Sequence, residues 1–400
     1  MIPPTVERRA RWVLDTIGVR DLGFGDDLPY RIEAWEQVER GERPQGDDLA
    51  EAFFHLARVE ERNGLRDEHD RFRAASSCLD PLDPPLERLR RRLGVEPPRW
   101  AGARFAVALT HDVDVPWKWT RQGVKGAAAR AKGDLTSGRF GPGLRELRGL
   151  AGATVHKVRG TDPYWSFDRI LEDERRLGAS STFFLLADHA HEFDGAAVEA
   201  YERLRPRLVE TLRDAKAEVG LHGSYSAADD PLRIADEKKR LERLSGPVQG
   251  QRYHYLRVDP HRNLGSLEAA GFAYDSSLGF GDAVGFRGGL AHPFRPWDFE
   301  REAPYDLIEV PLAAMDVTLS AERYLNLSAA QAEERLNSLV EWAAAHGGGF
   351  AVLWHSEQYD SALLPGWDRL YRRLIEEVQA RGGVCLQAGA LAEEAREWLS

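Results

Sequence analysis

Cysteine is scarce in this sequence: Cys78 and Cys385 are the two cysteines among 400 residues. Two cysteines make no disulfide framework and suit a reducing compartment. The first residues, Met-Ile-Pro-Pro-Thr-Val-Glu-Arg-Arg, lack the apolar core of a secretory signal, and no uninterrupted apolar run has the length of a membrane span. We therefore expect a cytoplasmic protein with no transmembrane segment.

Basic residues are also in deficit, because the formal net charge is −11. A nucleic-acid-binding protein normally carries a basic excess, so this class is excluded. The sequence contains neither a Gly-x-Ser-x-Gly motif nor a phosphate-binding Gly-Lys-Ser/Thr motif. What the chain does have is 42% hydrophobic residues and 11 tryptophans, enough for a sizeable core, and this composition argues against disorder.

An apolar run at residues 105–114 ends abruptly in two carboxylates, Asp112 and Asp114. In a β-strand, alternate side chains share a face, so both carboxylates would lie on the face that carries Ala106 and Ala108. Small residues suit the tight interior of a barrel, and barrel enzymes place their chemistry at the C-terminal ends of strands. The alternative for a lone Asp-x-Asp is a helix cap or a turn.

Five motifs follow one another in a recognisable order: Thr-His-Asp-Val-Asp at 110–114, Ser-Thr-Phe-Phe-Leu-Leu at 181–186, Gly-Leu-His-Gly-Ser-Tyr at 220–225, Tyr-Asp-Ser-Ser-Leu-Gly at 274–279 and Leu-Trp-His at 353–355. This order resembles that of the polysaccharide deacetylase family, carbohydrate esterase family four, in its Asp-x-Asp branch. The resemblance covers roughly residues 100–390. It implies an α/β fold, a distorted (β/α) barrel that often has seven strands.

The chain divides into two parts near a proline-rich stretch that ends at Pro97 and Pro98. Residues 1–98 show helical spacing and are expected to form a small, mainly helical appendage, to which we assign no chemistry. Residues 99–400 alternate between strand and helix patterns from position 165 onward, and this alternation predicts a parallel sheet. Periodicity alone does not choose between an open and a closed sheet; the resemblance favours the barrel.

The resemblance implies a general base at Asp112 and metal ligands at Asp114 and His222. Relatives carry a second histidine four residues after the first, but this chain has Ser226 there, and a hydroxyl is a poor substitute for imidazole on zinc. The expected cofactor is therefore a divalent metal, zinc in the first instance, that takes its third ligand from elsewhere, binds weakly or is absent. His254 is the candidate replacement, as a ligand, as a substrate contact or as a structural histidine.

Two arginines compete for the position that orients the catalytic carboxylate in the family. Arg252 lies in Arg-x-His-Tyr, which is similar to the family's Arg-x-Pro-aromatic motif, whereas Arg257 stands closer to the expected strand end, in a strand predicted over 249–257. We prefer Arg257 for this role and place Arg252 and Tyr255 at the substrate. An arginine that points into a barrel mouth is expected to meet a carboxylate.

The proton donor is predicted at His355, which ends the strand expected over 349–355. By the resemblance, Asp316 fixes the tautomer of this histidine and raises its pKa. Asp275 and Asp298 are alternatives for orienting roles, and Asp316 could also be a turn residue. Trp297 and Trp354 are candidates for a wall on which a sugar stacks, although most core tryptophans serve packing.

A local reversal of charge occurs at residues 121–160, where nine basic residues accompany only Asp134 and Glu146. One interpretation is a mobile flap that attracts an anionic substrate or membrane surface. The other is a solvated helical insertion, since basic runs usually face water.

Together these features predict a metal-assisted hydrolase that removes an N-acyl group, in the first instance acetyl, from an amino sugar of a glycan or glycan precursor. A second hypothesis is a metal-independent hydrolase of a non-sugar linear or cyclic amide. A third is a barrel that has lost catalysis and binds a glycan or a partner protein.

Overall fold

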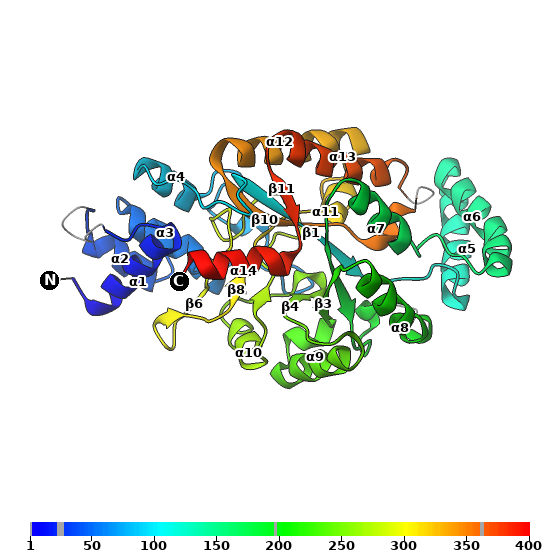
Figure 1. The fold of residues 1–400 in the computed structure, drawn as a ribbon, viewed down its shortest axis with the longest axis horizontal. Helices are drawn as coiled ribbons and strands as arrows, with labels where there is room; N and C mark the ends of the chain where they lie inside the picture. The colour runs from blue at the N-terminus through cyan, green and yellow to red at the C-terminus, as the bar shows by residue number, and fades with distance from the viewer. Residues whose placement is uncertain (1, 22–27, 196–197, 361–363) are drawn as a thin grey trace.

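The N-terminal region of the computed structural model is mainly helical, and the structure describes residues 2–21, 28–195, 198–360 and 364–400. Figure 1 shows this region at one end of the long axis of the molecule. Asp47 caps α3 by accepting from the N–H groups of Leu49 and Ala50, as expected of an aspartate before a helix. The elements here are α1 (Pro4–Thr16), α2 (Ile32–Glu39), α3 (Asp48–Leu56), η1 (Val59–Arg62), η2 (Ala74–Ser76) and α4 (Pro85–Arg92).

A parallel sheet forms the centre of the molecule, in the order β8-β5-β4-β3-β2-β1-β10-β9, with β11 paired to the first half of β1. Its strands are β1 (Phe105–Val113), β2 (Thr182–Leu186), β3 (Glu218–Gly223), β4 (Gly250–Tyr253), β5 (Tyr274–Asp275), β8 (Ile308–Glu309), β9 (Leu312–Met315), β10 (Gly348–Leu353) and β11 (Val384–Leu386). The α/β fold expected from the sequence is confirmed.

One stretch of chain, residues 308–315, pairs with both ends of this curled sheet. Its first part, β8, lies beside β5, and its second part, β9, lies beside β10. Pro311 separates the two parts, because proline has no N–H to donate to a neighbouring strand. If residues 308–315 are taken as a single strand, the path around the sheet has seven strands, as expected, with β11 outside it.

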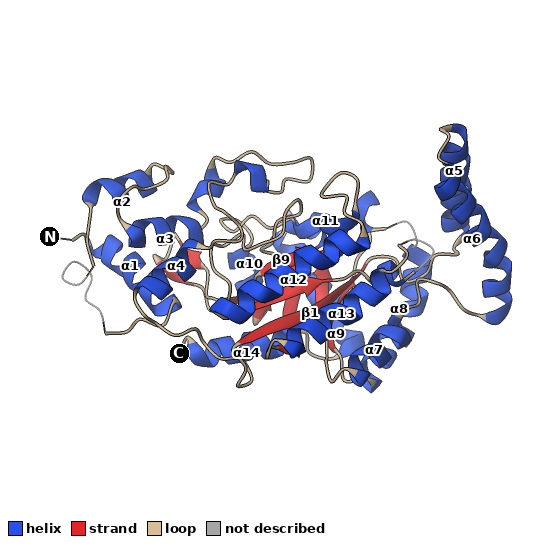
Figure 2. Ribbon diagram, turned by 90° about the horizontal axis from the view of Figure 1, so that it is seen from above, coloured by secondary structure: helices blue, strands red, loops and turns tan. Residues whose placement is uncertain are grey.

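Helices surround the sheet, as Figure 2 shows. They are α7 (Phe167–Arg176), α8 (Val198–Asp214), α9 (Pro231–Ser245), α10 (Leu264–Ala269), α11 (Asp316–Ser320), α12 (Ala329–His346), α13 (Trp367–Ala380) and α14 (Ala388–Trp398). A small antiparallel pair, β6 (Trp297–Asp298) and β7 (Ala303–Pro304), lies beside α1. Ser328 and Gln331 form a capping box at the start of α12.

The sheet separates an inner apolar cluster from a larger outer one. Ala106 and Ala108 of β1 belong to the inner cluster, with Phe184 and Ala351, whereas Val107 belongs to the outer cluster. This alternation follows from the two-residue period of a strand. The small alanines on the inner face therefore occupy the confined interior that the sequence predicts for them.

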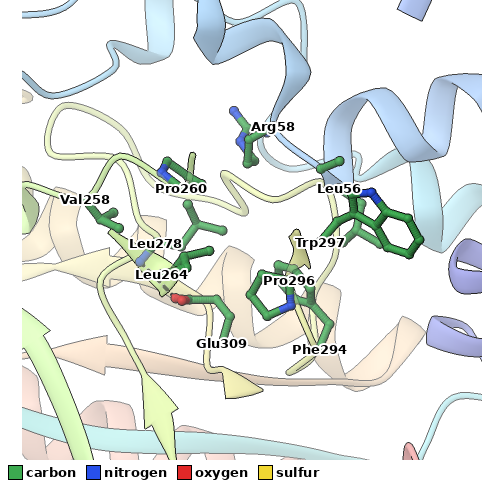
Figure 3. A pocket seen from close by; sticks show the side chains of 11 residues that line it. Leu56, Arg58, Val258, Pro260, Leu264, Leu278, Phe294, Pro296, Trp297 and Glu309 are labelled. Carbon is green, nitrogen blue, oxygen red and sulfur yellow. Dashed lines mark hydrogen bonds between the residues drawn. The ribbon is translucent and has the colours of Figure 1, made fainter. Parts of the chain in front are cut away.

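The N-terminal region packs directly on the barrel. The rings of Trp12 and Trp297 lie 5.1 Å apart, and the buried carboxylate of Glu61 pairs with Arg287 at 2.6 Å. Figure 3 shows Leu56 and Arg58 from this region around a cavity of about 10 Å³ that barrel residues also line. A cavity of that size holds one water molecule at most. The two parts are in close contact, and the domain boundary at residues 98/99 stays a prediction.

The basic stretch 121–160 forms two helices, α5 (Arg121–Thr136) and α6 (Phe140–Arg159), inserted between β1 and α7. Figures 1 and 2 both show this helical hairpin standing clear of the barrel, at the end opposite the N-terminal helices. Among the described residues, no helix is both long and apolar enough to cross a membrane.

Candidate active site

Two carboxylates mark the C-terminal end of β1. Asp112 belongs to the strand and is 2% exposed. Asp114 is the first residue after the strand, and its side chain is half-buried. β1 is central in the sheet, with β2 and β10 as its neighbours at this end. Side chains from the ends of several parallel strands can therefore converge on these two aspartates.

Arg252 holds Asp112 from the neighbouring wall of the barrel. It lies in β4, is completely buried, and donates to Asp112 Oδ1 at 3.0 Å and to Thr110 Oγ1 at 2.8 Å. The rest of its guanidinium donates to the carbonyl and hydroxyl oxygens of Ser276. The bond to Oδ1 orients Asp112 and pairs its charge with the guanidinium, and the other bonds fix the position of the buried arginine. Arg252, placed at the substrate from the sequence, is not among the described residues that line the cavity at the site.

Arg257, preferred for this position in the sequence, points elsewhere. Its guanidinium contacts the Asp229 carboxylate and the backbone carbonyls of His69 and Tyr225. The reason is that β4 ends at Tyr253, four residues before the predicted end, and His254–Leu256 form the 3₁₀ turn η5. Tyr255 and Leu256 have φ of 61° and 56°, and this left-handed turn carries Arg257 away from the strand end.

The side chains of Asp114, His222 and His254 form a compact group whose ligand atoms all lie within 4.8 Å of one another. His222 Nε2 is 3.3 Å from Asp114 Oδ1, and His254 Nε2 is 3.5 Å from Asp114 Oδ2. His222 is the next-to-last residue of β3, and His254 begins the turn η5. One carboxylate and two imidazoles are a donor set that suits zinc and related divalent ions.

A hydrogen bond at Nδ1 of each imidazole orients its Nε2 toward the centre of this group. His222 Nδ1 lies 2.9 Å from the Arg252 carbonyl, and His254 Nδ1 lies 3.0 Å from Asp194 Oδ1. Each Nε2 is left to face inward, as in metal sites where an outer partner fixes the histidine tautomer. His222 Nε2 and Asp114 Oδ1 are buried without a hydrogen-bond partner, so the residues present fit a bound metal ion.

Charge coupling within the group is strong. Burial alone would raise the pKa of Asp114, but His254 and His222 hold that pKa well below its ordinary value. Burial alone would lower the pKa of His254, yet the Asp114 and Asp194 carboxylates raise the pKa to about 9. Asp194 was not found from the sequence, because it lies in the short turn η3 (Glu192–Asp194), remote in the chain from His254 and outside any motif.

Ser226 does not contribute to this group. It lies in the 3₁₀ turn η4 (Tyr225–Ala228) after β3 and is not among the described residues that line the cavity at the site. His254 is instead the third member of the group, and it follows β4, the next strand in the sheet.

His355 and Asp316 meet next to this group. His355 follows β10, and its Nδ1 lies 2.7 Å from Asp316 Oδ1, while its backbone N–H donates to Asp316 Oδ2 at 2.6 Å. Burial alone would lower the pKa of His355, but the Asp316 carboxylate raises the pKa well above its ordinary value. The other nitrogen, Nε2, is 3.7 Å from Asp114 Oδ2. The charged imidazolium is therefore aimed at the same centre.

The two alternative orienting aspartates lie away from His355. Asp275 is buried beside Gln251 and Ser277, and Asp298 pairs with Arg301 at 2.5 Å. Trp354 is also placed differently from the sequence interpretation, because it points outward from the barrel and packs on Trp367 and Tyr371. Its neighbour Leu353 faces inward, so strand alternation excludes Trp354 from the cavity. Trp297 packs against the N-terminal region.

A cavity of about 130 Å³ opens over these groups. Besides Asp112, Asp114 and the three histidines, it is lined by Arg71, Tyr255, Leu256, Met315, Val317, Arg323, Tyr324, Leu353 and Glu357. Arg71 belongs to the N-terminal region, to which the sequence assigned no chemistry, and it donates to the Tyr324 hydroxyl at 2.7 Å. No sequence signal pointed to Arg71, since nothing local shows which distant segment a loop residue will contact.

Glu357 is a further group that the sequence reasoning missed. It lies two residues after His355 in the turn η6 (Ser356–Tyr359) and lines the cavity. Burial raises the pKa of Glu357 to about 8; the charge on His355 opposes this shift and the Asp114 carboxylate adds to it. Its closeness to a predicted catalytic histidine was the one available signal.

An α/β barrel with a polar, histidine-rich centre at the C-terminal ends of its strands is the class that the structure defines. No protein-family model and no curated protein sequence matches this chain. Among solved structures, the Puue allantoinase has a TM-score of 0.50 and 15% identity, with 80% of this chain and 97% of that chain covered.

Two proteins assigned as polysaccharide deacetylases align over similar lengths. That from Mycobacterium smegmatis has a TM-score of 0.49 and 19% identity, covering 74% of this chain and 91% of its own. That from Pseudomonas aeruginosa PAO1 has a TM-score of 0.49 and 16% identity, covering 75% and 95%. The expectation of a barrel of this kind is confirmed at the level of the fold.

Proposed function

We propose that the protein is a metal-assisted hydrolase that removes an N-acyl group, in the first instance acetyl, from an amino sugar of a glycan or glycan precursor. The observation that carries this proposal is the pairing of a base and an acid around one three-ligand group. Asp112 Oδ2 lies 3.6 Å from His222 Nε2, and His355 Nε2 lies 3.7 Å from Asp114 Oδ2. Amide hydrolysis needs such a base and such an acid.

Asp114, His222 and His254 would hold the ion, which when bound polarises an acyl carbonyl and makes water a better nucleophile. Asp112 then accepts the proton of the attacking water through Oδ2, while Arg252 keeps Oδ1 in place. His355 carries its proton at Nε2 and donates it to the departing amine, and the Asp316 carboxylate stabilises the charged imidazolium until that moment. Arg252, Asp194 and Asp316 act as positioning residues.

The lining of the cavity supports a polar substrate. Tyr255 and Tyr324 offer aromatic faces with hydroxyl groups, and Arg323 adds positive charge to the lining, while the charge of the buried Arg71 is paired with Asp67. A cavity of about 130 Å³ accommodates an acylamide group, and a sugar ring would then lie against its mouth. We place Tyr255 as a substrate contact on this basis.

A second candidate function is hydrolysis of a small linear or cyclic amide, with or without metal. The small size of the cavity favours it, and the fold is similar to that of the Puue allantoinase. A non-catalytic binding barrel is the third hypothesis. It leaves the acid and base around Asp114 without a role.

The test measures zinc content and the release of acetate and amine from N-acetylglucosamine oligosaccharides, beside a panel of small cyclic and linear amides. We expect about one equivalent of divalent metal, activity that chelation removes and zinc restores, and at least a 100-fold loss in Asp112→Asn. Asp229→Asn, which alters a carboxylate paired with Arg257 outside the site, is the matched control.

Turnover confined to the amide panel would favour the second function, and turnover that persists without metal would remove the metal from the proposal. Unchanged turnover in Asp112→Asn would exclude the assigned base. Because a metal must displace the proton held by His254, zinc uptake is expected to strengthen as pH rises toward about 9.

A further inference from the structure

The hairpin α5–α6 has its small residues inside and its large apolar residues outside. Among the side chains of the hairpin that the structure describes, the buried residues are Ala127, Ala131 and Gly143. A Cβ at Gly143 would lie 2.8 Å from the Leu135 side chain, so the two helices approach closely there. The hairpin therefore holds together without burying the large apolar side chains of α6.

Those side chains form one continuous stripe on the solvent face of α6. The stripe recurs at steps of three and four residues, which is the spacing of a single helix face. It consists of Phe140, Leu144, Leu147, Ala151, Val155 and Val158, all of them exposed. Phe140 is 64% exposed and Val158 is 83% exposed. Single exposed apolar residues are ordinary, but a stripe along a whole helix indicates an interaction surface.

Basic residues flank this stripe. With 3.6 residues per turn, Arg145, Arg148 and Arg159 fall on one side of it, and Arg139 and Lys157 fall on the other. Residues 121–160 contain nine basic and two acidic residues, a net charge of +7, while the whole chain has −11. The rest of the chain therefore carries −18, and the positive charge is concentrated on a projection that stands clear of the acidic body (Figure 1).

The base of the hairpin is fixed to the barrel. The Asp162 carboxylate accepts from the N–H groups of Lys118 and Trp119, and Lys118 Nζ pairs with Asp360 at 2.7 Å. Trp119 also lies against α6 near Gly149. The hairpin thus leaves the molecule at the C-terminal end of β1, the sheet edge that carries the candidate active site.

We propose that the α5–α6 hairpin binds the surface of an anionic lipid bilayer, with the apolar stripe of α6 in the interface and the flanking arginines and lysines at the headgroups. An amphipathic helix with large apolar residues on one face and basic residues beside them is suited to this position. Each Lys or Arg near an anionic surface adds to the attraction. Docking of a second hairpin onto the same stripe would oppose two charges of +7, so charge disfavours a second copy there.

The test is co-sedimentation of the full-length protein with vesicles of phosphatidylcholine alone and of phosphatidylcholine with phosphatidylglycerol at roughly 7:3. We expect binding to the anionic vesicles, little binding to the neutral ones, and weaker binding when salt rises from about 0.1 M to about 0.5 M. The double variant Phe140→Ser/Val158→Ser should lower the partition coefficient at least about tenfold. Arg145→Glu/Arg148→Glu should abolish the preference for anionic vesicles.

Leu232→Ser is the matched control, because Leu232 is an exposed leucine on α9, outside the hairpin. Leu232→Ser should bind vesicles as the unmodified protein does. All variants should show the same thermal unfolding transition as the unmodified protein. Equal binding to both kinds of vesicle, no binding to either, or unaltered binding by Phe140→Ser/Val158→Ser would each overturn the proposal. Self-association that this double variant removes, without vesicle binding, would assign the stripe to a second copy and would overturn it too.

Discussion

At the scale of single residues, the two key carboxylates of the site differ in their hydrogen-bond partners. Asp112 is held by a buried arginine, whereas Asp316 is held by the imidazole and backbone of His355. The same residue type therefore takes two roles because its partners differ. A carboxylate beside an imidazole favours the protonated ring, and the Asp316 carboxylate therefore raises the pKa of His355 against the effect of burial.

The Asp316→Asn variant tests this role. The amide cannot stabilise the imidazolium, so the pKa of His355 should fall, and the basic limb of kcat/KM should move to lower pH. The acidic limb, which does not depend on this imidazole, should stay in place. We expect kcat/KM to fall between about 100-fold and 10,000-fold at neutral pH. Both limbs are measured on an N-acetyl substrate, with Asp298→Asn as the control, since Asp298 pairs with Arg301 instead. A basic limb that does not move would remove Asp316 from this role.

Several residue positions could be predicted from the sequence and others could not. Strand alternation correctly placed Asp112 with Ala106 and Ala108, and Leu353 with His355, because the two-residue period is local. Arg71 and Asp194 were out of reach, since each arrives at the site through contacts between segments far apart in the chain. Trp354 was misjudged as a possible sugar contact although the same alternation turns it outward.

At the scale of elements, the two turns after β3 and β4 decide which residue joins Asp114 and His222 in the candidate metal group. The turn η4 after β3 leaves Ser226 outside the cavity, and the turn η5 after β4 brings His254 into it. The sequence predicted a longer β4 because residues 249–257 are suited to a strand. It could not show the left-handed backbone at Tyr255 and Leu256, since residues with a Cβ rarely adopt it.

The Ser226→His variant separates these two turns. Because residue 226 does not face the cavity, the new imidazole should leave zinc affinity unchanged within about twofold, whereas His254→Ala should weaken it by about 100-fold or more. Zinc affinity is measured by competition with a chromogenic chelator. Tighter binding by Ser226→His, or no loss in His254→Ala, would show that η4 and not η5 supplies the ligand.

At the scale of the whole molecule, the N-terminal region and the barrel share a buried ion-pair network. Glu61 accepts from Arg58 within the N-terminal region and from Arg287 in the barrel, and all three side chains are fully buried. Burial alone would raise the pKa of Glu61, but the two guanidinium groups lower it to about 2. A depressed carboxyl pKa adds stability above the unfolded value of 4.5, and this stability is lost as pH falls from 4.5 toward about 2.

Removing this charge should therefore destabilise the molecule as a unit. Glu61→Gln is expected to lower the free energy of unfolding by about 3–5 kcal/mol, because two buried arginines lose their shared carboxylate. Between pH 4.5 and about 2, the variant should lose less of its remaining stability than the unmodified protein. Urea unfolding at several pH values measures both effects. Glu333→Gln, which breaks a surface pair with Arg373, should change stability by about 0–1 kcal/mol.

Two separate unfolding transitions, with only the first altered in Glu61→Gln, would show that the two parts unfold independently. That result would support the predicted boundary at residues 98/99 as a division between domains. A single transition shifted by the substitution would show instead that the N-terminal region and the barrel unfold together.

Residues 308–315 join the two ends of the sheet. They are paired with β5 at one end and with β10 at the other, and Asp316 follows the last of them. His355 follows β10 and Asp316 follows β9, so the distance between the imidazole and the carboxylate depends on the pairing of these two strands. A shift of β9 along β10 would change the distance between the Asp316 carboxylate and the His355 imidazole. The closure of the sheet and the pKa of His355 are coupled in this way.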